Sequence, residues 1–280
     1  MLLNHKIGLG SVQFGLNYGI SNSSGQTPFE EVEKILNFAF SNNIHLIDTA
    51  SAYGSAEKIL GKFNKNRFKI VSKFLPPNLN ESVKIQFNQS LKDLQTNALY
   101  GYLAHRPLNL LENKNIWKDL LELKDQKKIE KIGYSLNESE EYYALKNAGM
   151  APDLVQVPFN YFDKRFLNIM EELKDDGCEI HSRSTFLQGL FFMDPAGLSE
   201  YFDEIKLALV DLQLKYKDQL HGVLLKYVIE NKYIDKVIVG TENLSQLQSN
   251  LKAMANAPII KANNFNFSDS ILVPSKWPQK

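Results

Sequence analysis

Short apolar runs alternate with longer segments of helical periodicity along almost the whole chain. Eight of these runs predict strands, at Ile7–Gly10, Ile44–Asp48, Phe68–Lys73, Leu99–His105, Ile129–Ser135, Leu154–Pro158, Glu179–Arg183 and Val237–Gly240. Regular alternation of strands and helices indicates an α/β protein with a parallel sheet covered by helices. Divided among eight such units, 280 residues leave roughly 35 for each, as a TIM-type (β/α)8 barrel requires. We therefore expect one barrel domain over residues 1–280.

Local patterns support the barrel over an open sheet. The first helical segment has four apolar residues at the spacing of one buried face: Val32, Ile35, Leu36 and Ala39. A doubly wound fold would be expected to carry a G-x-G-x-x-G turn after its first strand, and GLGSVQFG at Gly8–Gly15 lacks that spacing. The segment Asp194–Leu220 is longer than one helix needs, which predicts an additional helix after the seventh strand.

Composition excludes several classes of protein. The chain has 32 Lys+Arg and 32 Asp+Glu, so its formal net charge of zero lacks the basic footprint of a nucleic-acid binder. Its single cysteine, Cys178, excludes an internal disulfide framework and a cysteine-based zinc site. The five histidines show no ligand spacing, so we expect no metal. With no readable signal peptide and no membrane span, we expect a cytoplasmic monomer or weak homo-oligomer that does not bind membranes.

Three polar residues end consecutive predicted strands. Side chains alternate along a strand, so each of these residues points to the same side as the apolar residue two positions before it. The three residues are Asp48, which follows Leu46, Lys73, which follows Val71, and His105, which follows Leu103. In an α/β barrel, reactive residues lie at the C-terminal ends of strands, and Tyr53 follows in the loop after Asp48. Each residue alone has an ordinary structural explanation. A single Asp at a strand end is usually a turn residue, a single Lys there is usually solvated, and a single His usually packs in the core. Their matching positions favour one shared site.

These side chains suit the reduction of a carbonyl group. A carboxylate keeps a neighbouring ammonium charged, and that ammonium favours the ionised form of a nearby phenol. At about 4 Å and an effective dielectric of about 20, the attraction is roughly 4 kcal/mol. A phenol tuned in this way can transfer a proton near neutral pH. Tyr53 would give the proton to the carbonyl oxygen, His105 would donate a hydrogen bond to it, and a nicotinamide would give the hydride to carbon.

At these residues the chain resembles the aldo-keto reductases. The family pattern matches DTASAYGSAEKILG at Asp48–Gly61, VSKF at Lys73 and LAHRP at His105, and the similarity runs from about Lys6 to about Ala255. The resemblance implies a barrel that binds NADPH or NADH at its mouth and reduces an aldehyde or ketone to an alcohol. It also implies Tyr53 as general acid, Lys73 and Asp48 as the residues that tune it, and His105 as the residue that orients the carbonyl.

The resemblance extends to the nicotinamide end of the cofactor. It implies that Ser135 and Gln156 hold the carboxamide, although Leu136 stands where the family usually has asparagine. Arg183 stands where the family commonly has an aromatic residue that stacks on the nicotinamide. A guanidinium can also stack on a ring, and its charge would favour the reduced, uncharged nicotinamide.

The segment VIVGTENLSQLQSN resembles the part of the family that holds the adenosine half. The positions that match are Gly240, Thr241, Gln246 and Asn250. Members that prefer NADP commonly have cations here for the 2′-phosphate, whereas this chain has Gly240 and Gln246 with the acidic Glu242 between them. We therefore expect a slight tendency towards binding that tolerates NADH.

The substrate would be a small carbonyl compound. We expect Tyr18, Arg106, Phe159, Tyr161 and Arg183 near the reacting carbon. Two arginines would favour an anionic substrate, such as a nucleotide-linked sugar or a small keto acid. The tail over residues 259–280 carries three aromatic residues that either line the pocket or pack on the barrel: Phe265, Phe267 and Trp277.

Two other functions are compatible with this sequence. Lys73 at a strand end could form a Schiff base, as in carbon–carbon lyases, although pairing with Asp48 would keep it protonated and poorly nucleophilic. A reductase-like barrel could also bind nucleotide without catalysis, since a fold does not fix a function. A protein that only binds has no chemical need for all four of Asp48, Tyr53, Lys73 and His105, so we place both readings below the reductase.

Overall fold

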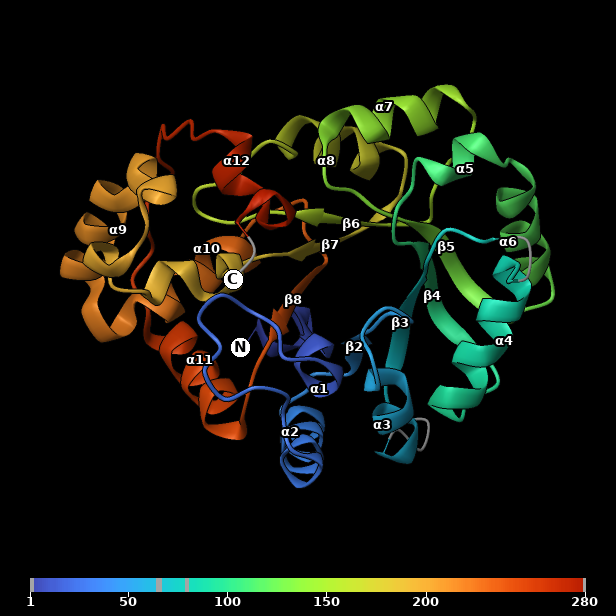
Figure 1. Cartoon of the computed structure of the whole chain (residues 1–280), viewed down its shortest axis with the longest axis horizontal. Coiled ribbons are helices and arrows are strands. Elements are labelled where there is room, and N and C mark those ends of the chain that lie inside the picture. Colours follow the sequence, from blue (N-terminus) through green and yellow to red (C-terminus); the bar gives the residue numbers. More distant parts are fainter. Residues whose placement is uncertain (1–2, 64–66, 79–80, 279–280) are drawn as a thin grey trace.

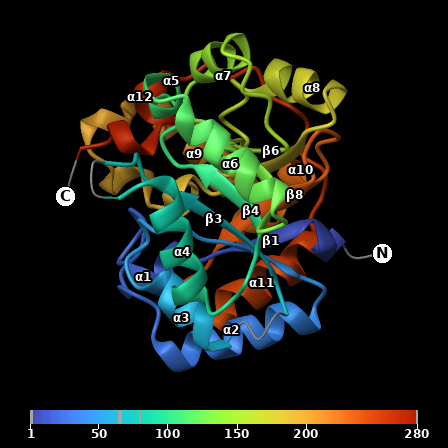
Figure 2. The same cartoon turned by 90° about the vertical axis from the view of Figure 1, so that its right-hand side faces the viewer.

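The computed structural model describes residues 3–63, 67–78 and 81–278, and it confirms the expected barrel. All neighbouring strands pair in parallel in sequence order, and the pairing of the first strand with the eighth closes the sheet (Figures 1 and 2). The strands are β1 (Ile7–Gly10), β2 (Leu46–Asp48), β3 (Lys69–Phe74), β4 (Leu99–Ala104), β5 (Ile129–Ser135), β6 (Leu154–Pro158), β7 (Glu179–Arg183) and β8 (Lys236–Gly240).

Helices surround the barrel (Figure 1). The longer ones between successive strands are α2 (Phe29–Ser41), α3 (Ala56–Phe63), α4 (Val83–Leu94), α6 (Asn115–Asp125), α7 (Ser139–Asn147), α8 (Leu167–Asp175) and α10 (Leu220–Ile229). After β8 comes α11 (Leu244–Asn256), and α1 (Val12–Gly15), α5 (Asn109–Glu112) and α12 (Asp269–Leu272) are short. The helix predicted between the seventh strand and its barrel helix is α9 (Asp203–Tyr216). Several 3-10 turns complete the chain: Leu3–Lys6, Leu187–Phe192, Pro195–Gly197, Glu200–Phe202, Lys217–Gln219 and Pro274–Lys276.

The apolar core has separate parts inside and outside the barrel wall. A small cluster shares one set of strand faces and fills the barrel: Leu46, Val71, Leu103, Leu154 and Ile238. The larger cluster lies between the strands and the helices and includes the predicted buried face of α2. Because the interior is packed, polar side chains on the same strand faces are confined to the two ends of the barrel. Within the ranges that the structure describes, no helix is long and apolar enough to cross a bilayer.

Five strand ends differ by one or two residues from their predicted positions. β3 runs from Lys69 to Phe74 rather than from Phe68 to Lys73, and β8 begins at Lys236 rather than Val237. β2 begins at Leu46 rather than Ile44, and β4 ends at Ala104, so His105 is the first residue of the following loop. The backbone N–H of His105 nevertheless donates to the carbonyl of Phe74 on β3, at 3.0 Å. This bond fixes His105 beside the end of β3, which carries Lys73.

The C-terminal tail packs on the outside of the barrel. Phe267 meets the ring of Phe162 edge-on at 4.9 Å, and Phe265 stacks on Phe267. Trp277 packs edge-on against Phe202 and donates its indole N–H to the carbonyl of Ile271 at 2.9 Å. Of the two alternatives for these aromatic residues, the structure shows packing; none of the three lines the cavity described below.

Candidate active site

The side chains of Asp48, Lys73 and Tyr53 meet at the C-terminal end of the barrel. Lys73 Nζ donates to both carboxylate oxygens of Asp48, at 2.8 and 2.7 Å, and to the carbonyl of Thr49 at 2.9 Å. The same ammonium lies 3.4 Å from the hydroxyl of Tyr53. The His105 ring meets the Tyr53 ring edge-on, with centroids 5.8 Å apart. The structure therefore brings together all four residues that the strand ends predicted.

Two glycines determine the position of Tyr53. Gly15 ends α1, and a Cβ there would lie 1.8 Å from the carbonyl oxygen of Tyr53. Gly54 has a φ of 56°, and a Cβ on it would lie 2.5 Å from the carbonyl oxygen of Gly15. Only residues without a side chain allow these two backbones to approach so closely. The Tyr-Gly pair of the sequence motif therefore packs the loop after β2 against α1.

The charge state of the site follows from burial and neighbours. Burial alone would lower the pKa of Lys73, but the Asp48 carboxylate and the Tyr53 hydroxyl outweigh it and raise the pKa overall. Burial, together with the cations Lys73, Arg183 and Arg106, lowers the pKa of His105 to about 3. Near neutral pH the site therefore holds a charged lysine and an uncharged histidine.

Gln156 occupies the strand position beside Ser135, and its side chain reaches Asp48. Its amide Nε2 donates to Asp48 Oδ1 at 2.8 Å. Ser135 and Gln156 are register partners at the ends of β5 and β6, and both are buried. Leu136, which follows Ser135, is fully buried in the outer core, so its side chain does not face the barrel mouth.

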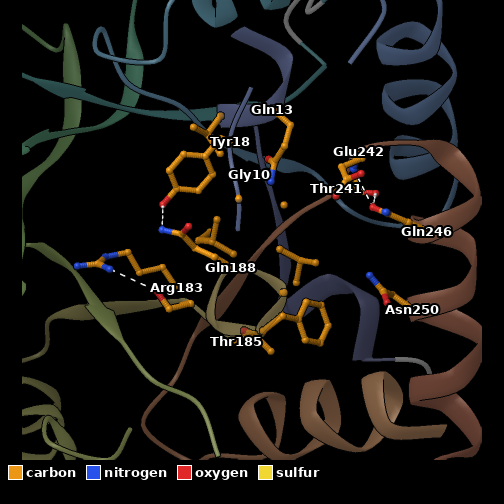
Figure 3. Close-up of a pocket in the computed structure, with 18 of the residues that line it drawn as sticks. Gly10, Gln13, Tyr18, Arg183, Thr185, Gln188, Thr241, Glu242, Gln246 and Asn250 are labelled. Atoms are coloured by element: carbon orange, nitrogen blue, oxygen red, sulfur yellow. Dashed lines mark hydrogen bonds between the residues drawn. The ribbon is translucent and has the colours of Figure 1, made fainter. Parts of the chain in front are cut away.

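A cavity of about 410 Å³ opens beside these residues. Many residues predicted for the site line it: Asp48, Tyr53, Gln156, Tyr18, Arg183, Gly240, Thr241, Gln246 and Asn250. Figure 3 shows Tyr18 and Arg183 near one end and Thr241, Gln246 and Asn250 near the other. This volume falls within the usual range of small-molecule sites, about 300–1,000 Å³.

Three residues expected near the reacting carbon lie elsewhere. Phe159 is buried in the outer core, where its ring stacks on Tyr227, with centroids 5.9 Å apart. Tyr161 packs edge-on against the same Tyr227 ring. Arg106 is exposed and does not line the cavity. Phe159 continues the outward face that Val155 and Val157 form on β6, so alternation along the strand directs its ring into the outer core.

Sequence reasoning missed the polar residues that follow β1 and β7. Ser11 Oγ, Gln13 Oε1 and Thr185 Oγ1 are buried, belong to residues that line the cavity, and have no hydrogen-bond partner among the described residues. Buried polar atoms are normally satisfied, so each of these marks a place for a polar ligand. Gly240 forms a close wall nearby, since a Cβ there would lie 2.9 Å from Gln13 Oε1. The signal in the sequence was their position directly after barrel strands.

Loops after β1 and β7 meet across the cavity. Gln188 Nε2 donates to the hydroxyl of Tyr18 at 3.0 Å (Figure 3). Ser21 Oγ donates to the carbonyl of Gln188 at 3.2 Å. Gly189 has a φ of 87°, and a Cβ on it would lie 1.8 Å from Ser21 Oγ. This glycine therefore allows the two loops to touch.

Three backbone N–H groups around the start of α11 are bonded within the protein itself. Leu244 N donates to Glu31 Oε1 at 2.8 Å, and Gln246 N donates to the Asn243 side chain at 2.9 Å. Glu242 N donates to the side chain of Gln246 at 2.9 Å. The bond from Leu244 lowers the pKa of Glu31, so a carboxylate occupies the end of the helix where an anion would otherwise bind.

Together, a closed parallel barrel and an Asp-Lys-Tyr-His site at its C-terminal end define an oxidoreductase of the carbonyl-reducing class. The aldo/keto reductase family model matches residues 6–268. This chain belongs to the aldo/keto reductase family, whose members catalyse carbonyl reduction with NADPH or NADH. A search of curated proteins finds no significant match.

Solved structures share the fold at low sequence identity. An aldo-keto reductase from Bacillus halodurans, in its holo form, is 19% identical with a TM-score of 0.70, over 92% of this chain and 88% of that chain. A Klebsiella pneumoniae aldo/keto reductase in complex with NADP and acetate is 20% identical, with a TM-score of 0.66 over 91% and 87% of the two chains. A Pseudomonas aeruginosa protein assigned to the aldo-keto reductases is 24% identical, with a TM-score of 0.65 over 90% of each chain.

Proposed function

We propose that this protein reduces an aldehyde or ketone to an alcohol with Tyr53 as the proton donor. The observation that carries the proposal is the position of Lys73 Nζ, which contacts both oxygens of Asp48 and lies 3.4 Å from the Tyr53 hydroxyl. A buried ammonium in this place stabilises the phenolate that remains after Tyr53 has given up its proton. Asp48 keeps that ammonium charged, and solvent returns the proton to Tyr53 after each turnover.

The residues around the cavity fit a dinucleotide cofactor. Unpartnered polar atoms of Ser11, Gln13 and Thr185 face a ligand of mixed polarity, and Gly10 and Gly240 leave room for it. Ser135 and Gln156 would hold the carboxamide, and Thr241, Gln246 and Asn250 the adenosine half. When bound, NADPH or NADH supplies a hydride to the carbonyl carbon while the carbonyl oxygen takes the proton of Tyr53.

His105 would position the carbonyl without changing its own charge. Its pKa of about 3 keeps the ring neutral at working pH, so it acts as a hydrogen-bond donor or acceptor rather than as an acid. Its Nδ1 has no partner among the described residues. A neutral donor beside Tyr53 would direct one lone pair of the carbonyl oxygen to each of the two side chains.

The end of the cavity that would hold the adenosine half of the cofactor favours NADH over NADPH, or binds both. Glu31 and Glu242 place two carboxylates there, and the backbone N–H groups of Glu242, Leu244 and Gln246 are already bonded within the protein. No cation of the described chain lines the cavity at this end. A 2′-phosphate would therefore meet negative charge without gaining a positive partner.

Equilibrium titration with NADH and NADPH, followed by a panel of aldehydes, ketones and keto acids, tests this proposal. We expect saturable binding and carbonyl-dependent oxidation of the reduced cofactor. Binding without turnover of any carbonyl would favour a nucleotide-binding role, and binding of neither cofactor would contradict the proposal. The Schiff-base alternative predicts borohydride trapping of a carbonyl on Lys73. The raised pKa and complete burial of that lysine count against it.

A further inference from the structure

Arg183 brings a positive charge without an acidic partner into the reaction end of the cavity. It ends β7, lines the cavity, and is held by neutral acceptors. Its Nη2 donates to the carbonyl of Leu136 at 2.7 Å and to Asn137 Oδ1 at 2.6 Å, and its Nη1 donates to Ser184 Oγ at 3.3 Å. Among the described residues, no carboxylate forms an ion pair with it. The guanidinium is thus fixed in place with its charge uncompensated.

The neighbouring groups do not cancel this charge. Asp48 and Lys73 neutralise each other in a buried pair, and the low pKa of His105 leaves that ring neutral. The field of Arg183 reaches both sides of the reacting position, since it contributes to lowering the pKa of His105 and opposes the rise in the pKa of Tyr18 caused by burial. The reaction end therefore carries one net positive charge.

We propose that Arg183 makes the site select the reduced cofactor over the oxidised one. The inference rests on the proposed function, which places a nicotinamide beside Tyr53 and His105. The oxidised ring carries a full positive charge and the reduced ring carries none, whereas the rest of the dinucleotide is the same in both. A fixed cation next to the ring therefore weakens binding of the oxidised form only.

The expected effect is large enough to measure. Two unit charges about 6 Å apart at an effective dielectric of about 20 repel by an energy equivalent to roughly a hundredfold in affinity, and solvent in the open cavity reduces this towards tenfold. Selectivity of this kind assists turnover in the direction of reduction. The contact between Tyr18 and Gln188 joins two loops across the cavity, and product release limits the turnover of many enzymes.

Equilibrium titrations of the full-length protein with the reduced and the oxidised form of one cofactor test the proposal. The readout is the ratio of the two dissociation constants, oxidised over reduced, followed by protein fluorescence. We expect a wild-type ratio of about ten or more, a similar ratio in Arg183→Lys, which keeps the charge, and a ratio at least fivefold smaller in Arg183→Gln. Lys118→Gln is the matched control: it removes an exposed cation on α6 that does not line the cavity, and the ratio should not change.

Several outcomes would overturn the inference. A wild-type ratio near one would do so, and this needs no variant. An Arg183→Gln protein that binds both forms more weakly by the same factor would show a purely structural role. If Arg183→Gln kept the wild-type ratio of dissociation constants but had a higher KM for anionic carbonyl compounds, the charge of Arg183 would serve to bind the substrate rather than to distinguish the two cofactor forms. If the wild type reduces carbonyls but shows no redox selectivity, only this inference fails; if it binds neither cofactor form, the proposed function fails with it.

Discussion

Gln156 Nε2 donates a 2.8 Å hydrogen bond to Asp48 Oδ1, the same oxygen that accepts a bond from Lys73 Nζ. The two partners lie 108 residues apart and come from strands β6 and β2. The bond holds the Asp48 carboxylate against rotation, so both of its oxygens face Lys73. Gln156, which the family resemblance assigns to the cofactor, thus also holds in place the Asp48–Lys73 pair beside Tyr53, the proposed proton donor.

Replacing Tyr53 with phenylalanine should remove most turnover and leave cofactor binding nearly unchanged. The substitution deletes only the hydroxyl that lies 3.4 Å from Lys73 Nζ, and general acid catalysis typically contributes about 10²–10⁴-fold. Steady-state kinetics and a cofactor titration of the same preparation would measure both effects. Tyr143→Phe on the exposed surface of α7 is the control and should behave as wild type. Normal rates in Tyr53→Phe would refute the mechanism.

Asp48→Asn should destabilise the fold as well as the reaction. The change leaves a fully buried ammonium without its counter-charge, and breaking a buried pair in this way costs about 3–5 kcal/mol. Chemical denaturation at neutral pH would measure the loss. Glu122→Gln breaks the exposed pair with Lys84 and should change the stability by no measurable amount. If both substitutions changed the free energy of unfolding by the same amount, the buried Asp48–Lys73 pair would contribute no more to stability than an exposed pair.

The low pKa of His105 predicts acid sensitivity. As the pH falls below the ordinary value of 6.5, the unfolded chain takes up a proton on this ring, whereas the folded protein does not until about pH 3. Because the unfolded state then binds more protons, stability falls with pH across this window. His105→Gln removes this contribution, so it should lose less stability than wild type between pH 7 and pH 4.5. The prediction would be contradicted if wild type and His105→Gln lost the same stability between pH 7 and pH 4.5. A His105 NMR resonance that titrates near pH 6.5 in the folded protein would contradict it as well.

The acidic residues at the adenosine end should discriminate against NADPH. Glu31→Gln and Glu242→Gln should each tighten NADPH binding by roughly threefold to tenfold, with less effect on NADH, because each removes a negative charge near the 2′ position. Titration of both cofactors at low salt would measure the change. Glu33→Gln, on the exposed face of α2, is the control. A wild-type protein that binds NADPH about a hundredfold tighter than NADH would refute the expectation.

Local sequence patterns were sufficient to predict the barrel and the strand ends that carry the candidate site. Strand spacing and helical periodicity are local signals, and alternation of side chains was sufficient to place Asp48 and Lys73 on inward faces at neighbouring strand ends. Four of the strands have the predicted bounds, and the others differ by at most two residues at an end. These features depend only on residues close together in the chain.

Contacts between side chains far apart in the chain could not be predicted and became visible only in the folded protein. The bond of Glu31 to the start of α11 joins residues 213 apart, and the Tyr18–Gln188 contact joins residues 170 apart. Tyr161 lies in a packed aromatic cluster because the path of the loop after β6, not the residue type, decides whether its ring faces the cavity or the core. Such contacts form when the barrel closes and brings loops from opposite ends of the chain to one mouth, and no local periodicity encodes them.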